Sequence, residues 1–137
     1  MTIDMKEINY KDMKFNPFNL FGDEWMLVTA GNEQKCNTMT VSWGHLGCLW
    51  GHNDPTAVVY LRQSRYTKEF VDREGYFRLC VMDKSFKKQM AYLGSASGRD
   101  EDKISKAGLT PVYADNTVWF ENRRSEERRV GEECRSR

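Results

Sequence analysis

The stretch EWMLVTAGNEQKCNTMTVSW, residues 24–43, decides the fold class. Glu24–Ala30 is rich in strand-forming residues and ends at the turn signal Gly31-Asn32, and Cys36–Trp43 reads as a second strand after a short polar connection. Two strands joined this closely predict an antiparallel hairpin. Because no helix separates them, the pair does not fit a doubly wound parallel sheet, which needs a helix after nearly every strand.

The second strand has two chemically different faces. Successive residues of a strand point to opposite sides, so the hydroxyl side chains share one face and the apolar ones the other: Thr38, Thr40 and Ser42 against Met39, Val41 and Trp43. The hydroxyl face could bond a polar heterocycle, and Trp43 could cover a ring. Ordinary strand composition explains the same residues, since Thr is a good strand former and Trp a good core residue.

The rest of the body continues as strands with short helices in the connections. The glycines at 44, 47 and 51 interrupt regular structure through residues 45–54. Further strands are predicted over Thr56–Arg62, Tyr76–Met82, Leu109–Tyr113 and Thr117–Phe120, and helices over Tyr66–Arg73, Ser85–Leu93 and Arg99–Ala107. Thr56–Arg62 is a nearly continuous apolar run, typical of a buried strand. The last two strands form a hairpin without a partner in this sequence, so we predict a mainly β fold: a small antiparallel barrel with helical crossings.

Composition excludes several classes of protein. The 137 residues, 39% of them hydrophobic, suit one domain. A net charge of +1 argues against a nucleic-acid binder, which needs a basic face. No apolar run approaches the roughly 20 residues of a membrane-spanning helix, and the amino terminus has no apolar signal-peptide centre. Cys36, Cys48 and Cys80 are an odd number in the body. We therefore expect a cytoplasmic protein with no nucleic-acid and no membrane partner.

Residues 123–137, RRSEERRVGEECRSR, differ from everything before them. Six Arg and four Glu leave Val130 as the one aliphatic residue, so the stretch cannot bury a face. It resembles the in-frame translation of a sequencing adapter, with Glu132 in place of a lysine, although natural charged tails are common. We expect one domain at residues 1–122, followed by a non-native, disordered tail at 123–137.

The most informative motif is Arg62-Gln63-Ser64-Arg65-Tyr66-Thr67, where a predicted strand meets a predicted helix. The amino terminus of a helix presents unpaired N–H groups and a partial positive charge. The Ser64 and Thr67 hydroxyls, with the guanidinium groups of Arg62 and Arg65, add donors that a phosphate needs. The commoner alternative is that Ser64 caps the helix and the arginines are solvated.

A loop of small residues, Gly94–Gly98, leads into a charged segment. Either Ser97 or Asp100 could cap the helix that follows. Alternatively, the loop could close over an anionic ligand and bring Arg99 and Lys103 to it.

A metal site is a weaker alternative. Cys36, His45, Cys48 and His52 are suitable ligand types, but their spacing is not that of a zinc ribbon or finger. No nucleophile elbow, Walker A motif or GxGxxG run is present, so hydrolase and dinucleotide-fold interpretations lack support.

Three motifs, taken in order, resemble the flavin reductase-like FMN-binding split-barrel family, with its flavoredoxin and ferric-reductase-like members nearest in appearance. They are Asn37–Trp43, Arg62–Thr67, and Ser97-Gly98-Arg99-Asp100 with Asp102-Lys103. The resemblance covers roughly residues 16–120. It implies a homodimeric, six-stranded antiparallel barrel that binds FMN non-covalently near the subunit interface.

Carried over by position, the resemblance implies three groups of cofactor contacts. The isoalloxazine would lie against Asn37 and Trp43, with Thr38, Thr40 and Ser42 near its polar edge. Ser64, Arg65 and Thr67, together with Arg62 of the same motif, would hold the phosphate, and Ser97, Arg99 and Lys103 would approach from the loop.

The resemblance also implies an oxidoreductase whose chemistry belongs to the flavin, so no side chain is predicted to be catalytic. NADH or NADPH would supply electrons, which would leave to a flavin, a metal complex or a protein. The alternatives are an FMN-binding electron carrier without nicotinamide turnover and a non-catalytic split-barrel remnant. Because relatives continue past this body, we expect a domain incomplete at its carboxyl terminus, with exposed strand edges. Relatives often carry a small residue in place of His45, and the roles of His45 and His52 stay open.

Overall fold

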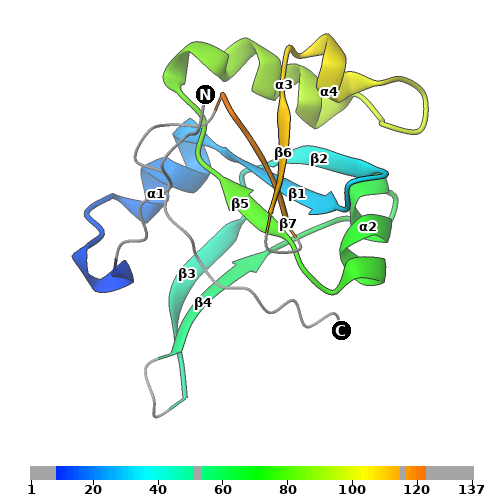
Figure 1. Ribbon diagram of the computed structural model, residues 1–137. Coiled ribbons are helices and arrows are strands. Elements are labelled where there is room, and N and C mark those ends of the chain that lie inside the picture. The colour runs from blue at the N-terminus through cyan, green and yellow to red at the C-terminus, as the bar shows by residue number, and fades with distance from the viewer. Residues whose placement is uncertain (1–8, 51–53, 115–116, 123–137) are drawn as a thin grey trace.

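A three-stranded antiparallel sheet lies at the centre of the computed structural model, which describes residues 9–50, 54–114 and 117–122 (Figure 1). Its strand order is β2-β1-β5, with β1 at Met26–Gly31, β2 at Cys36–Val41 and β5 at Arg78–Cys80. The pairing of β1 with β2 runs from Met26 opposite Val41 to Gly31 opposite Cys36, which confirms the predicted hairpin. Every residue of β1 is buried, so this strand is the middle of the molecule.

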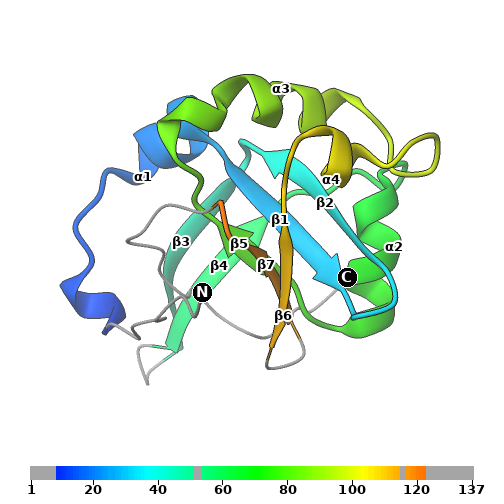
Figure 2. The same ribbon diagram turned by 45° about the horizontal axis from the view of Figure 1, so that its top comes forward.

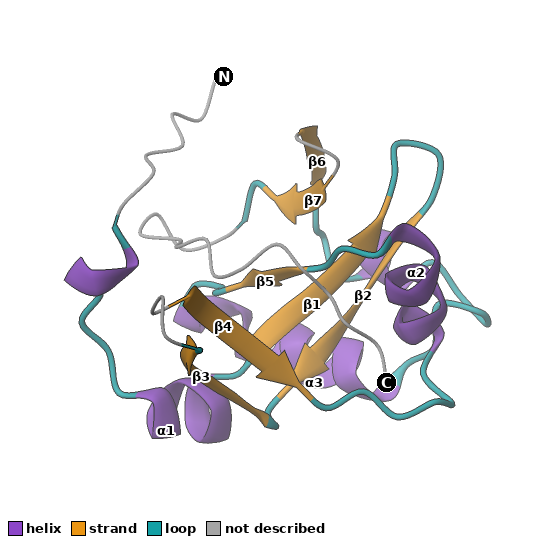
Figure 3. Cartoon of the chain, turned by 90° about the horizontal axis from the view of Figure 1, so that it is seen from below, coloured by secondary structure: helices purple, strands orange, loops and turns teal. Residues whose placement is uncertain are grey.

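Helices cover both faces of this sheet (Figure 3). On one face, α2 at Tyr66–Glu74 packs Phe70 and Val71 into a cluster with sheet residues that include Val28 and Met39. On the other, α3 at Lys87–Ser95 packs Met90 and Leu93 into a cluster with Leu27 and Cys80. Burial on two faces explains why β1 is apolar except for Thr29, whose hydroxyl is bonded to Thr38.

A second hairpin, absent from the sequence prediction, leads away from the sheet (Figure 2). It pairs β3 at Gly44–Leu49 with β4 at Asp54–Val59. The prediction that glycines break this region is wrong for Gly44 and Gly47, which pair within β3, and Gly51 lies outside the described residues. At Gly44 a Cβ would come within 2.4 Å of the Val58 carbonyl oxygen and 2.6 Å of the Phe21 ring. The close approach of backbone and ring therefore requires the glycine.

The strand predicted at Thr56–Arg62 is shifted and less buried than expected. In β4 one face, including Ala57 and Val59, packs against the α2-side core, but the other leaves Val58 46% exposed. Exposed apolar and aromatic side chains continue along this side of the hairpin, which we call the outer face: Trp43, His45, Leu49, Val58 and Tyr60. The apolar run is thus a strand with two apolar faces, of which the structure covers one.

The last hairpin pairs β6 at Pro111–Ala114 with β7 at Thr117–Phe120, close to the predicted bounds. It was expected to lack a partner, and β6 and β7 do form a separate two-stranded sheet. Their side chains nevertheless complete the α3-side core, because Trp119 and Phe120 pack with Leu27 and Cys80. Among the described residues the hairpin therefore has no partner strand, as predicted, although its side chains pack on the core.

Short helical segments connect these strands: η1 at Tyr10–Asp12, α1 at Pro17–Asn19, the π-helical η2 at Leu20–Glu24, η3 at Lys84–Phe86 and α4 at Lys103–Lys106. The helix predicted over Arg99–Ala107 is shorter, because Asp102, rather than Ser97 or Asp100, accepts the capping bond, from the Ser105 N–H at 3.2 Å. As predicted, Gly75 ends α2, with φ of +75°. The described residues confirm a mainly β architecture with short helices, and the predicted tail at 123–137 lies outside them.

Replacing Phe120 with Ala tests the role of the last hairpin. Phe120 is fully buried, so the substitution removes a large core side chain and should lower the free energy of unfolding by about 3–5 kcal/mol. Urea denaturation measures this, with Phe18→Ala as the control because Phe18 is 84% exposed. Equal, small losses in the two variants would show that β7 does not pack on the core.

Candidate functional site

Three segments that are distant in the sequence meet at the amino terminus of α2. The side-chain amide of Asn37, in β2, donates to the hydroxyl of Thr67, in α2, at 2.9 Å. Both side chains are buried, with 3% and 1% of their surface exposed. This buried bond joins the first two predicted motifs. Since its hydroxyl oxygen accepts from Asn37, Thr67 keeps its own proton for another acceptor.

The third segment, the loop between α3 and α4, packs directly against this pair. A Cβ at Gly98 would lie 2.2 Å from the side-chain oxygen of Asn37 and 3.1 Å from the Tyr66 ring. A side chain at position 98 would therefore force the loop away from β2 and α2. Glycine at this position lets the backbone close on the other two segments.

Arg99 extends from the loop across the first turn of α2. Its guanidinium donates to the Ser64 carbonyl oxygen at 3.2 Å, pairs with Glu69 at 2.7 Å, and lies 4.9 Å from the centre of the Tyr66 ring. Ser64 itself is exposed, and the loop residue Ser97 accepts from the Arg99 N–H at 3.2 Å. Arg99 thus connects the loop to the predicted phosphate motif.

Arg65 occupies the N-cap position of α2, and no side chain caps that helix end. The alternative that Ser64 caps the helix is therefore not the arrangement found. The guanidinium of Arg65 donates from Nη1 to the Gly94 carbonyl oxygen at 2.7 Å. Its Nη2 is buried and has no hydrogen-bond partner among the described residues. A buried donor without a partner is costly and indicates a place for an acceptor.

Lys103 is the most deeply buried cation of the site, with 2% of its surface exposed. Its Nζ donates to the carbonyl oxygens of Leu93, at 3.0 Å, and Ala96, at 3.1 Å. Burial, with a further contribution from the neighbouring charge of Arg65, lowers the pKa of Lys103 to about 8.

A cleft of about 470 Å³ opens beside these segments. Its lining is mainly polar and includes Lys35, Cys36, Asn37, Tyr66, Gly98, Arg99, Lys103 and Tyr113. The Cys36 thiol lies 3.6 Å from the Tyr113 hydroxyl, and burial raises the pKa of both groups, that of Tyr113 to about 12. A thiol held neutral is a poor nucleophile.

The hydroxyl face of β2 lies on the opposite side of the sheet from Asn37. Thr38 is fully buried and bonds to the Thr29 hydroxyl at 2.9 Å and the Val28 carbonyl oxygen at 3.0 Å. Thr40 donates to the Met90 carbonyl oxygen at 2.5 Å. These two hydroxyls therefore join strands and helix α3, and the alternation of side chains along β2 keeps them away from the Asn37 side.

The remaining predicted residues, Ser42, Trp43 and Arg62, lie at the β3–β4 hairpin. The guanidinium of Arg62 lies 5.3 Å from the centre of the Trp43 ring, and Trp43 is 55% exposed on the outer face of the β3–β4 hairpin. Ser42 is half-buried beside it in sequence. The structure thus brings together Asn37, Ser64, Arg65, Thr67, Ser97, Arg99 and Lys103, but not Thr38, Thr40, Ser42, Trp43 and Arg62.

Sequence reasoning did not single out Tyr66 and Lys35. The Arg99 guanidinium lies over the Tyr66 ring, and the Lys35 ammonium lies 5.4 Å from the centre of the same ring. The position of Tyr66, first in the helix and directly after Arg65, is a signal for the former. Nothing in the local sequence marks Lys35.

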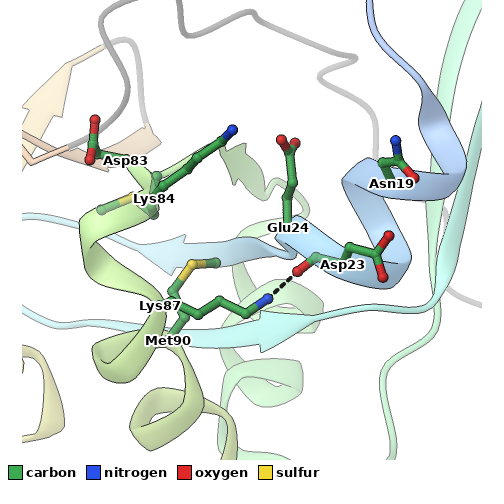
Figure 4. Close-up of a pocket in the computed structure, with 8 residues that line it drawn as sticks. Asn19, Asp23, Glu24, Asp83, Lys84, Lys87 and Met90 are labelled. Carbon is green, nitrogen blue, oxygen red and sulfur yellow. Dashed lines mark hydrogen bonds between the residues drawn. The ribbon is translucent and has the colours of Figure 1, made fainter.

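A second cleft, of about 430 Å³, lies between η2 and the start of α3 (Figure 4). Lys87 crosses it, donating to the Asp23 carbonyl oxygen with its ammonium over the Trp25 ring. No predicted site residue lines this cleft.

Among the described residues, no group of three or more His, Cys, Asp or Glu could hold a metal ion, and His52 lies outside them. In the same residues no helix is long and apolar enough to cross a membrane.

Comparison with solved structures gives several similar folds. Flavoredoxin of Desulfovibrio vulgaris (Miyazaki F) matches with a TM-score of 0.63 and 26% identity, covering 71% of this chain and 53% of that one. An FMN-binding domain of a flavin reductases-like enzyme from Shewanella baltica OS155 matches with a TM-score of 0.64 and 21% identity, over 78% and 56% of the two chains. A structure from Shewanella frigidimarina NCIMB 400, described as having a split barrel domain, matches with a TM-score of 0.61 and 22% identity, over 74% and 51%.

The chain spans about half the length of these proteins and shares their split-barrel fold, with its own three sheets separate rather than closed. No curated protein matches the sequence. The model of the flavin reductase like domain matches residues 18–125, which include the central sheet, both covering helices and every residue of the site. The chain therefore belongs to the family of the flavin reductase like domain.

Proposed function

We propose that this chain binds FMN with its phosphate at the amino terminus of α2 and serves in flavin-dependent electron transfer. The observation that carries the proposal is the convergence of the Ser64–Thr67 motif and the Arg99 loop at one helix end, beside the buried unpaired Nη2 of Arg65. A nine-residue helix supplies N–H groups and a partial positive charge there.

The donors present fit a phosphate. The free Nη2 of Arg65 is a charged donor, the Thr67 hydroxyl has its proton available, and Ser64 is exposed at the same turn. Arg99 already lies across the turn, where its guanidinium is paired with Glu69. We propose Ser64, Arg65, Thr67, Ser97 and Arg99 as the residues that hold the phosphate, with Asn37 on the side toward the flavin ring.

Two other groups of residues have different proposed roles. Thr38 and Thr40 support the site by joining β2 to its neighbours, since their hydroxyls are already bonded inside the fold. Trp43, with Arg62 on its ring and Ser42 next to it, is exposed and available to a planar ligand or to a second subunit.

Bound FMN would supply the electron transfer, and the protein would bind, orient and shield it. We propose NADH or NADPH as the electron donor, and a flavin, a metal complex or a protein as the acceptor. A carrier role without nicotinamide turnover is a second candidate, because one of the similar structures is a flavoredoxin. The three thiols of the described chain are free, in keeping with a proposed location in the reducing cytoplasm.

We also propose a homodimer formed through the outer face of the β3–β4 hairpin, because exposed aromatic and aliphatic side chains gathered on one face mark an interaction site. Sedimentation velocity should find a dimer for the native sequence. The double substitution Val58→Ser and Tyr60→Ser should give a monomer, while Phe18→Ser, at a site exposed elsewhere, should not. A native monomer, or a dimer that the double variant keeps, contradicts this proposal.

Replacing Arg65 with Ala tests the phosphate assignment. Loss of a charged hydrogen-bond donor costs about 1.5–3 kcal/mol, so FMN should bind roughly 10- to 150-fold more weakly, while riboflavin, which has no phosphate, should bind almost as before. Quenching of flavin fluorescence measures both affinities. Arg73→Ala, at the other end of the same helix, is the control. If both flavins weaken equally, the helix end is not where the phosphate binds.

Anaerobic mixing of the FMN-loaded protein with NADH or NADPH distinguishes the two candidate functions. A reductase should lose its flavin absorbance within the time of an enzyme turnover, whereas a carrier should keep it until a protein donor is added. A protein that shows no flavin absorbance after FMN is added and the unbound FMN is removed contradicts both candidate functions.

A further inference from the structure

Two cations from different elements bind the last turn of α3. Arg65, before α2, donates to the Gly94 carbonyl oxygen at 2.7 Å. Lys103, the first residue of α4, donates to the carbonyl oxygens of Leu93 and Ala96 at 3.0 and 3.1 Å. The carboxyl end of a helix carries unpaired carbonyls and a partial negative charge. This turn is therefore the part of the fold that can hold two neighbouring positive charges together.

The Lys103 ammonium faces the backbone rather than the cleft. The residue is 2% exposed, and both of its hydrogen bonds go to carbonyl oxygens of the α3 end. The family resemblance leads one to expect Lys103 to approach the flavin or its phosphate directly. The contacts instead give it an indirect role, through the turn that also binds Arg65.

The charge of Lys103 can be separated from its contacts. A neutral amine keeps two N–H groups, enough for both the Leu93 and the Ala96 carbonyl oxygens. Deprotonation therefore removes the positive charge beside Arg65 without requiring either hydrogen bond to break. A dianionic phosphate on Arg65 would offset the repulsion between the two cations and favour the charged form of Lys103.

We propose that Lys103 is a positioning residue of the anion site: it holds the α3 turn that fixes Arg65 for a phosphate, and phosphate binding in turn keeps Lys103 protonated. The inference rests on the proposed function and adds to it a dependence on pH. Burial and Arg65 lower the pKa of free Lys103 to about 8, while Glu101 acts in the opposite direction. Above that pH the free protein has lost the proton, so binding must take one up and the affinity must fall.

Other titratable groups line the same cleft and need controls. Cys36 of β2 and Tyr113 of β6 have raised pKa values, and Glu101 and Asp102, before α4, are acids. Ionisation of Cys36 or Tyr113 would also repel a phosphate, so Cys36→Ser and Tyr113→Phe serve as control variants that should keep the fall in FMN affinity. Riboflavin serves as the matched ligand, because it shares the flavin ring and every effect of pH on that ring.

Calorimetry tests the proposal on the unmodified protein. At about pH 8.5, FMN binding measured in two buffers of different ionisation enthalpy should show uptake of roughly half a proton or more, and riboflavin binding should show none. From about pH 7.5 to 9 the FMN affinity should fall by about three- to tenfold. Absence of proton uptake, or an equal fall for riboflavin, overturns the proposal.

Substitutions separate position from charge. Lys103→Arg, which stays charged, should bind FMN with an affinity that does not change over this range, whereas Lys103→Met should bind it at least about fivefold more weakly throughout. Lys106→Met, at an exposed residue paired with Glu101, should behave as the native protein does. If Lys103→Met does not fold, two measurements still test the role of Lys103: proton uptake by the native protein, and the pH dependence of FMN affinity in Lys103→Arg.

The Arg65→Ala and Lys103→Met variants distinguish a wrong phosphate site from a wrong role for Lys103. If Arg65→Ala leaves FMN affinity unchanged, the proposed function is wrong. If Arg65→Ala weakens FMN binding while Lys103→Met and pH leave it unchanged, the proposed function stands and the role of Lys103 is wrong.

Discussion

The arrangement of the candidate site depends on two like charges that share one helix end. Arg65 and Lys103 come from different elements, and carbonyl oxygens at the α3 carboxyl terminus accept from both. Because these contacts tie α2 and α4 to α3, the loop between α3 and α4 must pass close to the start of α2. Gly98 makes that passage possible, and the buried bond from Asn37 to Thr67 attaches β2 to the same place.

Much of this could be predicted from the sequence where a local signal and the tertiary contact agree. The turn at Gly31-Asn32 indicated the β1–β2 hairpin, and Gly75 indicated the end of α2. The helix-start motif around Arg65 indicated a cluster of donors, and the structure adds the loop residue Arg99 to that cluster. In each case the feature depends on residues close together in the chain, for which turn and capping chemistry are good guides.

Features set by distant contacts were not predictable in this way. Gly44 reads as a strand breaker until Phe21 and Val58 are seen to occupy the space a side chain would need. The hydroxyls of Thr38 and Thr40 look available on a single strand, yet they are hydrogen-bonded to β1 and to α3, respectively. Lys103 looks like a ligand contact in a charged segment, and only its burial reveals bonds to the end of α3. The apolar run around Val58 indicated a strand buried on both faces. In the described chain its outer face is exposed.

The relative affinity of the native protein for FMN and riboflavin tests the central claim most directly, since the two ligands differ by the phosphate alone. A site built from a helix end, a buried unpaired guanidinium nitrogen and two hydroxyls should bind FMN at least about tenfold more tightly than riboflavin at neutral pH. Equal affinities would contradict the assignment of the α2 amino terminus as the place where the cofactor is held.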